Sequence, residues 1–207
     1  MSEHQTENLF LFDCQELGVK KTETEDPSKK FRHLYRYMTA LTYATDLPAE
    51  NRQIALDYGC GSGYGTEMLS LYFKKTVGVD SNLGAIAYAK KMHSRGESIY
   101  CTGAEWALHG PFDFITCIEV IEHMPIETAK HIIKVLHMAL EPSGVLYITT
   151  PIATTNDGVN PQNPWHVHEW QPSELGDFLS ELFHDVQIQE IIGAGPAMAA
   201  ACKNPKE

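Results

Sequence analysis

Several features are absent from this chain of 207 residues, and each absence narrows what the protein can be. No apolar run is long enough to cross a membrane, and the first residues, MSEHQTENLFLFDC, lack the basic start of a signal peptide. The five cysteines are odd in number and form no C-x-x-C pair, which favours a reducing compartment over a disulfide framework. We therefore expect a cytoplasmic protein with no membrane partner.

Basic residues are also scarce. The chain has 16 Lys and Arg against 27 Asp and Glu, which gives a formal net charge of −11. Such an excess of acid disfavours a broad nucleic-acid footprint. With 43% hydrophobic and 21% charged residues, the composition is otherwise that of one globular domain with a full core. We predict a flexible arm over residues 1–28 and a single domain over residues 29–207.

The most informative stretch is 54–69, IALDYGCGSGYGTEML. A short apolar run of the kind that forms a buried parallel strand is closed by Asp57. Glycines follow at positions 59, 61, 63 and 65, and apolar residues at helical spacing come next. The pattern predicts a strand, a tight glycine turn and a helix. Open α/β sheets bind their ligands at such a turn, where the missing Cβ lets a ligand approach the backbone.

Two classes of ligand compete for this turn, with a glycine turn that binds nothing as the remaining alternative. The dinucleotide fingerprint G-x-G-x-x-G is not met, because its third glycine position falls on Tyr64 or on Thr66. The run is instead D-x-G-x-G-x-G. A carboxylate before the turn would repel a pyrophosphate, but it suits a ligand with an ammonium group, such as S-adenosylmethionine.

At 57–63, DYGCGSG, the chain resembles the first motif of the class I S-adenosylmethionine-dependent methyltransferases. The resemblance covers about residues 30–202. It implies S-adenosylmethionine as the cofactor. It also implies an α/β fold with a Rossmann-like, doubly wound sheet of seven strands. That sheet is mostly parallel, ends in an antiparallel C-terminal hairpin and carries helices on both faces.

The remaining patterns fit this fold. We predict further strands over 75–80, 98–101, 112–119, 145–150, 186–192 and 197–202, and helices over 29–46, 83–92, from Pro125 to about 140, and 172–182. Asp80 ends the second strand, where a carboxylate can accept hydrogen bonds from ribose hydroxyls. The alternative role for Asp80 is a helix N-cap, but Ser81 or Asn82 could serve there.

Two further segments carry weaker signals for the cofactor. The helix over 29–46 contains His33, Arg36 and Tyr37, which resemble an H-x-x-R-Y run in a helix that helps to cover the cofactor, although plain packing on the sheet is an equal alternative. Related methyltransferases often have an Asp before the Ala of 102–106, TGAEW, to bind the adenine amino group. Here that position is glycine, so Glu105 or the backbone of 104–105 would take over. Trp106 either packs on the adenine or lies in the core.

A second strong signal is 119–124, EVIEHM, which closely resembles the fourth motif of ubiquinone-type and sugar methyltransferases. Glu122 and His123 are expected at the mouth of the site, where the chain leaves the fourth strand. The long loop over 151–170 ends in NPWHVHEW, which resembles an N-P-x-H-x-x-E stretch that frames the acceptor in related enzymes. Both segments follow parallel strands, so they should converge.

Methyl transfer to oxygen or nitrogen often needs a base, and histidine suits that role near neutral pH. We predict His123 as the base, oriented by Glu122 or Glu169, with His166 as the second choice and a structural role as the alternative for each. Small-RNA 2′-O-methyltransferases use a similar E-x-x-E-H run with later histidines to hold magnesium. Because magnesium prefers oxygen ligands, we expect no metal ion here.

We therefore predict methyl transfer to an oxygen or nitrogen atom of a small-molecule or glycan-type acceptor. The alternatives are a metal-assisted nucleic-acid methyltransferase of the RNA 2′-O type and a non-catalytic S-adenosylmethionine-binding protein. The predicted cofactor-binding residues are Tyr37, Asp57, Gly59, Cys60, Gly61, Gly63, Asp80, Ser81, Ala104, Glu105, Trp106, Glu119 and Val120, and the predicted catalytic residues are His123, Glu122, His166 and Glu169.

Overall fold

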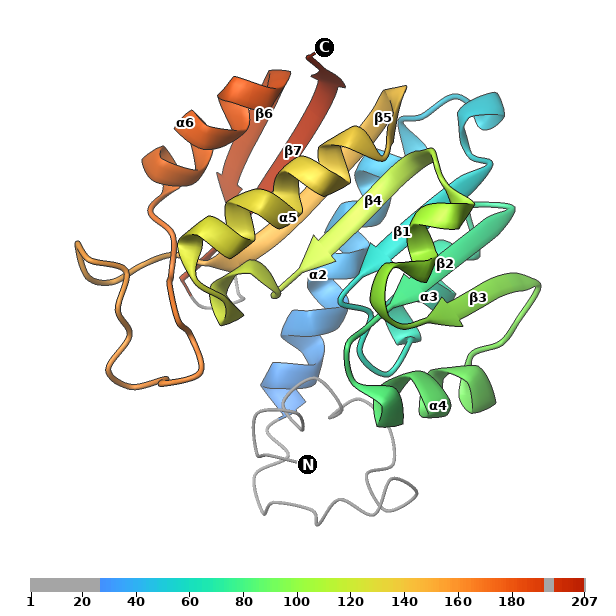
Figure 1. Ribbon diagram of the computed structural model, residues 1–207, viewed down its shortest axis with the longest axis horizontal. Helices are drawn as coiled ribbons and strands as arrows, with labels where there is room; N and C mark the ends of the chain where they lie inside the picture. Colours follow the sequence, from blue (N-terminus) through green and yellow to red (C-terminus); the bar gives the residue numbers. More distant parts are fainter. Residues whose placement is uncertain (1–26, 192–195, 207) are drawn as a thin grey trace.

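The computed structural model describes residues 27–191 and 196–206, with seven strands in one sheet (Figure 1). The strands are β1 (Ile54–Tyr58), β2 (Lys75–Val79), β3 (Glu97–Cys101), β4 (Phe112–Ile118), β5 (Leu140–Pro151), β6 (Phe183–Glu190) and β7 (Ala197–Pro205). The helices are α2 (Pro27–Thr45), α3 (Tyr64–Leu69), α4 (Leu83–Met92), α5 (Ile126–Met138) and α6 (Pro172–Leu182), with short 3-10 turns η1 (Ala49–Asn51), η2 (Gly103–His109) and η3 (Ile121–His123).

The strand order is β3-β2-β1-β4-β5-β7-β6. Strands β1 to β5 pair in parallel, and β7 runs antiparallel between β5 and β6. The chain moves outward from β1 to β3 and then returns to place β4 on the other side of β1. The predicted fold is confirmed, and the carboxyl ends of β1 and β4 form the topological switch point of the sheet.

Helices cover both faces of the sheet. Figure 1 shows α5 and α6 in front of the strands and α2 and α3 behind them. Side chains along β5 alternate accordingly, with Leu146 and Ile148 in the core under α5 and α6, and Val145 and Tyr147 in the core under α2. Each face of the sheet therefore has its own buried core, and the face to which a strand side chain points determines which helices it contacts.

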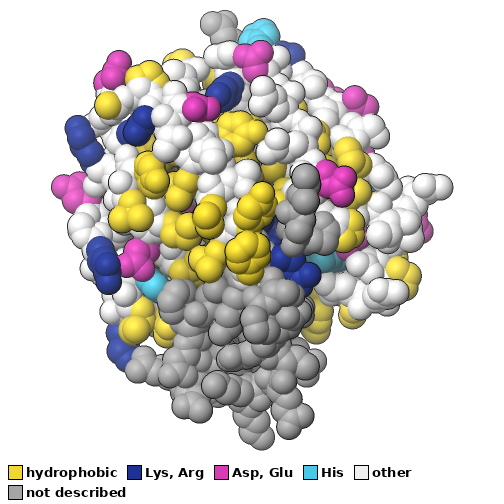
Figure 2. Space-filling model, turned by 180° about the vertical axis from the view of Figure 1, so that it is seen from behind, with side chains coloured by type: hydrophobic (Ala, Val, Ile, Leu, Met, Phe, Trp, Pro, Cys, Tyr) yellow, Lys and Arg dark blue, Asp and Glu magenta, His cyan; other side chains and the backbone are white. Residues whose placement is uncertain are grey.

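The face seen from behind in Figure 2 carries hydrophobic side chains with charged ones scattered among them. The exposed large hydrophobic residues on α2 and just after α3 are Phe31, Met38, Leu71 and Tyr72. Lys and Arg are interspersed with Asp and Glu on this face (Figure 2). Within the described ranges, no helix combines the length and the apolar character that a bilayer crossing requires.

Several boundaries differ from the sequence-based expectation, among them the start of β6 at Phe183 and the end of β7 at Pro205. Helix α2 begins at Pro27, two residues inside the predicted arm, and the rest of that arm lies outside the described residues. Strand β5 begins at Leu140, which pairs with Phe112, before a register shift and the exposed residues 142–143. Proline is tolerated at such an irregularity because no ladder hydrogen bond is needed there. Residues 142–144 therefore interrupt a strand that begins five residues before its predicted start at residue 145.

Candidate active site

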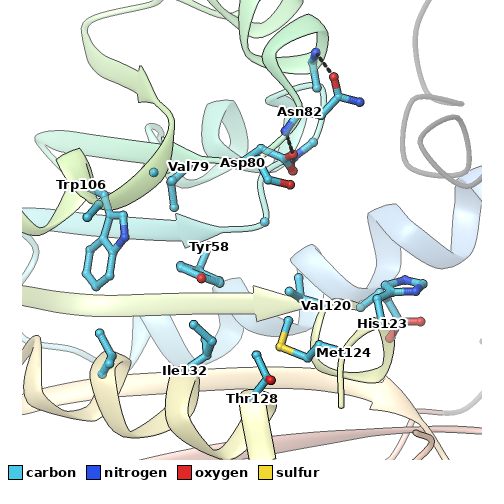
Figure 3. A pocket seen from close by; sticks show the side chains of 18 of the residues that line it. Tyr58, Val79, Asp80, Asn82, Trp106, Val120, His123, Met124, Thr128 and Ile132 are labelled. Carbon is cyan, nitrogen blue, oxygen red and sulfur yellow. Dashed lines mark hydrogen bonds between the residues drawn. The ribbon is translucent and has the colours of Figure 1, made fainter. Parts of the chain in front are cut away.

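A cavity of about 760 Å³ opens at the carboxyl ends of the parallel strands (Figure 3). Nine predicted site residues line it: Gly59, Gly61, Asp80, Ser81, Ala104, Trp106, Glu119, Val120 and His123. They lie in the segments that follow β1, β2, β3 and β4. In Figure 3 the cavity runs from Trp106 on the left, past Tyr58 and Asp80, to His123 on the right. One end is therefore apolar and aromatic, and the other carries ionisable groups.

The glycine turn is fastened to the end of β2. The amides of Gly59 and Cys60 both donate to the carbonyl of Val79, at 2.8 and 3.0 Å. Gly59 and Gly61 have φ values of +79° and +53°, in the left-handed region that favours glycine. A Cβ on Gly59 would lie 2.4 Å from Cγ2 of Val120, so glycine here also lets the turn pack on the end of β4.

Two residues predicted to bind the cofactor face away from the cavity. A Cβ on Gly63 would lie 2.6 Å from Cβ of Ala89 on α4, so this glycine allows α3 and α4 to pack closely. Cys60 is buried in a small core with Ile86, Ala89 and Tyr100. Neither residue is part of the cavity lining. Their contribution is to support the turn from behind, which the glycine pattern alone does not distinguish from ligand contact.

Asp80 is held so that it can still accept hydrogen bonds from a ligand. Its Oδ2 accepts from the Gly61 amide at 2.9 Å, and its Oδ1 accepts from the Asn82 amide at 2.8 Å. Because a carboxylate oxygen has two lone-pair sites, each oxygen keeps one acceptor site. The side chain of Asn82 caps α4 through the amides of Gly84 and Ala85, at 2.9 and 3.2 Å. The cap is therefore Asn82, and Asp80 lines the cavity.

Asp57, which the sequence predicts to bind the cofactor, does not line the cavity. It is fully buried and accepts hydrogen bonds from the hydroxyls of Tyr37, Thr66 and Thr116, at 3.0, 2.8 and 2.8 Å. Burial raises the pKa of Asp57 to about 6, although these hydroxyls oppose the shift. The reason is strand alternation, since Asp57 points with Ala55 toward α2 and α3. Tyr37 is buried beside it and ties α2 to β1.

Glu119, which directly follows β4, is a carboxylate that does line the cavity. Its φ is +55°, a strained conformation for a non-glycine residue. Arg36 Nη2 lies 2.8 Å from Glu119 Oε2, and the Thr149 hydroxyl donates to Oε1 at 3.0 Å. Arg36 is itself buried. Arg36 belongs to the H-x-x-R-Y run but is not among the residues predicted for the site, because its ion pair with Glu119 depends on the fold.

At the other end the walls are apolar. Trp106 is buried, with its ring 6.0 Å from the ring of Tyr58, and both line the cavity. Glu105, predicted to take the place of the absent aspartate, is exposed and lies outside the lining. Lining residues that the sequence reading missed are Tyr58, Val79, Asn82, Ala85, Gly103, Met124, Thr128, His131, Ile132 and Val135. The last five of these follow β4, in or just before α5. In the sequence, the spacing of helix residues that line a cavity cannot be told from that of residues that pack in a core.

The segments after β4 and β5 meet, as the parallel strands predicted. The amides of Val167 and His168 donate to the carbonyl of Glu122, at 2.7 and 3.2 Å. His123 Nδ1 lies 3.0 Å from the carbonyl oxygen of Trp165. The rings of His123 and His166 are 5.2 Å apart. The loop over 152–169 is thereby fixed against η3, although it has no regular secondary structure.

Partners of the two histidines determine which ring atoms carry lone pairs. A carbonyl only accepts hydrogen bonds, so His123 Nδ1 carries the proton and the neutral ring keeps its lone pair on Nε2. His166 Nδ1 lies 2.5 Å from Glu169 Oε1, which also accepts from Asn160 at 2.6 Å. Glu169 therefore orients His166. The Trp165 carbonyl, rather than Glu122 or Glu169, holds Nδ1 of His123.

Glu122 is buried next to His123. Its Oε2 accepts from the Thr150 hydroxyl at 3.2 Å, while no described residue forms a hydrogen bond with its buried Oε1. Oε1 lies 3.8 Å from His123 Nε2. Burial first, and then the charge of Glu119, raises the pKa of Glu122 well above its usual range. One ligand atom each from Glu122, His123 and His166 all lie within 4.8 Å of one another, a spacing that could hold a metal ion.

Comparisons with known proteins agree with this geometry. A family model described as a methyltransferase domain matches residues 29–189. A probable S-adenosylmethionine-dependent methyltransferase of Mycobacterium tuberculosis (strain CDC 1551 / Oshkosh) is 26% identical over an alignment of 149 residues, and the match covers 66% of this chain and 54% of that protein. A ubiquinone biosynthesis O-methyltransferase of Marinobacter nauticus is 24% identical over an alignment of 196 residues, and the match covers 81% of this chain and 78% of its own length.

Solved structures share the fold. N-methyltransferase NodS from Bradyrhizobium japonicum WM9, in complex with S-adenosyl-L-homocysteine, has a TM-score of 0.70 at 18% identity and covers 97% of this chain and 100% of its own. Small RNA methyltransferase HEN1 has a TM-score of 0.66 at 22% identity, covering 91% of this chain and 27% of its own. The chain spans about half the length of the mycobacterial relatives that it matches. The chain therefore belongs to the methyltransferase-domain family, and its resemblance to the class I S-adenosylmethionine-dependent methyltransferases is confirmed.

Proposed function

We propose that this protein transfers a methyl group from S-adenosylmethionine to a hydroxyl oxygen of a small-molecule acceptor. The observation that carries the proposal is His123, which lines the cavity and whose tautomer leaves a basic nitrogen at the polar end. The named relatives include ubiquinone biosynthesis O-methyltransferases. A hydroxyl must lose its proton as the new bond forms, and that step needs a base.

S-adenosylmethionine supplies a methyl group on a sulfonium centre, and the residues present fit it. The cavity volume of about 760 Å³ lies within the ~300–1,000 Å³ common for small-molecule sites. Asp80, with two spare acceptor sites, would hold the ribose hydroxyls. Trp106 and Tyr58 would enclose the adenine. The Arg36–Glu119 ion pair would face the charged amino-acid part, a role that the sequence had assigned to Asp57.

The polar end would then activate the acceptor. His123 Nε2 takes the hydroxyl proton, and the resulting imidazolium keeps its Nδ1–H on the Trp165 carbonyl. Glu122 Oε1 lies 3.8 Å from Nε2, so the positive charge that forms on the ring would favour the ionised state of this carboxyl group and pair with it. His166, oriented by Glu169, stands beside the same point with its own lone pair. General-base catalysis of this kind contributes about 10²–10⁴ in rate.

The test is a screen with isotopically labelled S-adenosylmethionine. The acceptors would be catechols and other phenols, sugars, primary amines, and a small RNA duplex with free 2′-hydroxyls. We expect labelled product and S-adenosylhomocysteine with one class of small hydroxyl compounds. Product from RNA alone would overturn the small-molecule assignment, and product from amines alone would overturn the hydroxyl. Tight S-adenosylhomocysteine binding with no product from any acceptor would favour a non-catalytic binding protein.

A divalent metal ion is a second candidate for the group that activates the hydroxyl. It is favoured by the convergence of Glu122, His123 and His166 within 4.8 Å and by the hydrogen bonds behind both imidazoles, which orient metal-binding histidines in proteins. Two imidazoles and one carboxylate suit zinc, iron or cobalt better than magnesium. Activity that survives exhaustive chelation supports the base. Activity that is lost to chelation and restored by one of these ions supports the metal.

A further inference from the structure

Two adjacent threonines lie near the carboxyl end of the long strand β5, with their side chains on opposite faces of the sheet. Thr149 and Thr150 are both fully buried. Along β5, Tyr147 packs in the core under α2, and Ile148 packs in the core under α5 and α6. Because side chains alternate along a strand, Thr149 follows Tyr147 toward α2 and Thr150 follows Ile148 toward α5. Neither threonine lines the cavity.

Thr149 holds Glu119 at two points. The Thr149 hydroxyl donates to Glu119 Oε1 at 3.0 Å, and the Thr149 carbonyl accepts from the Glu119 amide at 3.0 Å. The other carboxylate oxygen, Oε2, lies 2.8 Å from Arg36 Nη2. A residue with φ of +55° persists only where its surroundings fix it, and these contacts supply that restraint. The hydroxyl therefore helps to keep Glu119 at the end of the cavity assigned to the methyl donor.

Thr150 holds the other glutamate. Its hydroxyl donates to Glu122 Oε2 at 3.2 Å. This bond turns the second oxygen, Oε1, toward His123, whose Nε2 lies 3.8 Å away. Glu122 is almost fully buried, so water does not replace a lost donor at this carboxyl group. The direction of Glu122 Oε1 then depends on the Thr150 hydroxyl.

Valine has nearly the same shape as threonine and would fill either buried space, but it lacks the hydroxyl donor. At position 150 it would leave the buried Glu122 carboxyl group without the Thr150 hydrogen bond, and at position 149 it would leave the partly buried Glu119 carboxylate to Arg36 alone. We propose that Thr149 and Thr150 are positioning residues that divide the site, Thr149 serving the donor end through Glu119 and Thr150 serving the acceptor end through Glu122. This division rests on the proposed function. It holds whether His123 acts as a base or as a metal ligand.

The experiment compares four variants: Thr149→Val, Thr150→Val, Thr149→Ser and Thr150→Ser. Thr149→Val should weaken S-adenosylhomocysteine binding about 3–30-fold by calorimetry, with kcat at saturating donor within about threefold of wild type. Thr150→Val should lower kcat about 10–100-fold and leave S-adenosylhomocysteine affinity within about twofold. Each serine variant keeps the hydroxyl and should restore its own defect to within about threefold of wild type.

A second readout needs no acceptor. Selective ¹⁵N labelling of histidine gives imidazole signals by NMR, and Thr150→Val should move those of His123 while Thr149→Val leaves them in place. If wild type methylates nothing, the proposed function fails, but binding and NMR still test the division. The division is overturned if both valine variants change the same quantity. It is also overturned if serine rescues no better than valine, or if only the melting temperature changes.

Discussion

The two ends of the cavity are built in different ways. At the donor end, the glycine turn and Asp80 are joined by backbone amides from residues 59–61 and 82, all close together in the sequence. At the acceptor end, the contacts join Glu122 and His123 to Thr150, Trp165 and residues up to 168. The glycine turn and Asp80 are thus a local part of the donor end that one stretch of sequence encodes, and the Arg36–Glu119 ion pair completes that end from α2 and from the end of β4. The acceptor end exists only after the sheet has formed and the loop over 152–169 has docked on η3.

This difference predicts that the two ends can be damaged separately, and the largest effect should be at the acceptor end. His123→Ala should lower kcat about 10²–10⁴-fold, because the base is lost, while S-adenosylhomocysteine affinity changes little. His131→Ala is the matched control, since His131 lines the same cavity from α5 but is exposed. Steady-state kinetics and calorimetry check both. Unchanged turnover per folded His123→Ala molecule would move the role of base to His166.

At the donor end, we expect Gly61→Val to cause the largest loss of cofactor affinity. A β-branched residue at φ of +53° is strained and would move an amide that Asp80 accepts from, so donor affinity should fall about 100-fold. Gly96→Val is the control, because Gly96 has φ of +57° and open space around an added Cβ. Both variants bear a similar backbone cost, but only Gly61→Val should lose binding in calorimetry. Equal losses would mean that the turn does not cradle the ligand.

Beneath the donor end, Asp57 should make stability depend on pH. The pKa of Asp57 is about 6 in the folded protein, against an ordinary 3.8. Between these two pH values the folded state keeps a proton that the unfolded chain has lost. The associated stability is present below about pH 4 and is lost as pH rises through 6, up to about 3 kcal/mol in total. Urea unfolding of wild type and Asp57→Asn at several pH values isolates this contribution. A difference between them that does not vary with pH would contradict it.

The smallest effect should come from Asp80→Asn, which keeps the shape of the side chain but loses one acceptor oxygen and the charge. We expect S-adenosylhomocysteine affinity to fall by about 1–3 kcal/mol. Glu105→Gln removes the same charge from an exposed neighbour outside the cavity and should leave affinity within about twofold. If Glu105→Gln weakened binding as much as Asp80→Asn, net charge rather than hydrogen bonding would explain both.

At the donor end, the sequence predicts where the site lies but not the direction in which each side chain points. The D-x-G-x-G-x-G run and the acid after β2 located the turn and Asp80. They did not reveal that Asp57 points to α2, because a motif carries residue types and not the face that each side chain takes. For the same reason the motif predicts Gly63 and Cys60 as cofactor-binding residues, and it does not reveal that they pack against α4 and β3.

At the acceptor end the sequence predicted which segments meet but not how their atoms pair. Parallel strands imply that the segments after β4 and β5 lie at one edge, and they do. The hydrogen-bond partner of His123 Nδ1 is the main-chain carbonyl of Trp165, and because every residue has such a carbonyl, the sequence does not identify it. Ile132 and Val135 of α5 look like core residues in the sequence, yet they line the cavity. Tertiary placement alone distinguishes these roles.

The most direct measurement is calorimetry of the wild-type protein and of His123→Ala with S-adenosylhomocysteine and, separately, with NAD. We predict S-adenosylhomocysteine binding with a dissociation constant on the order of micromolar in both proteins, and NAD binding at least about tenfold weaker. That result would show a donor site that is formed independently of the acceptor end. Tighter binding of NAD than of S-adenosylhomocysteine, or loss of S-adenosylhomocysteine binding in His123→Ala, would contradict it.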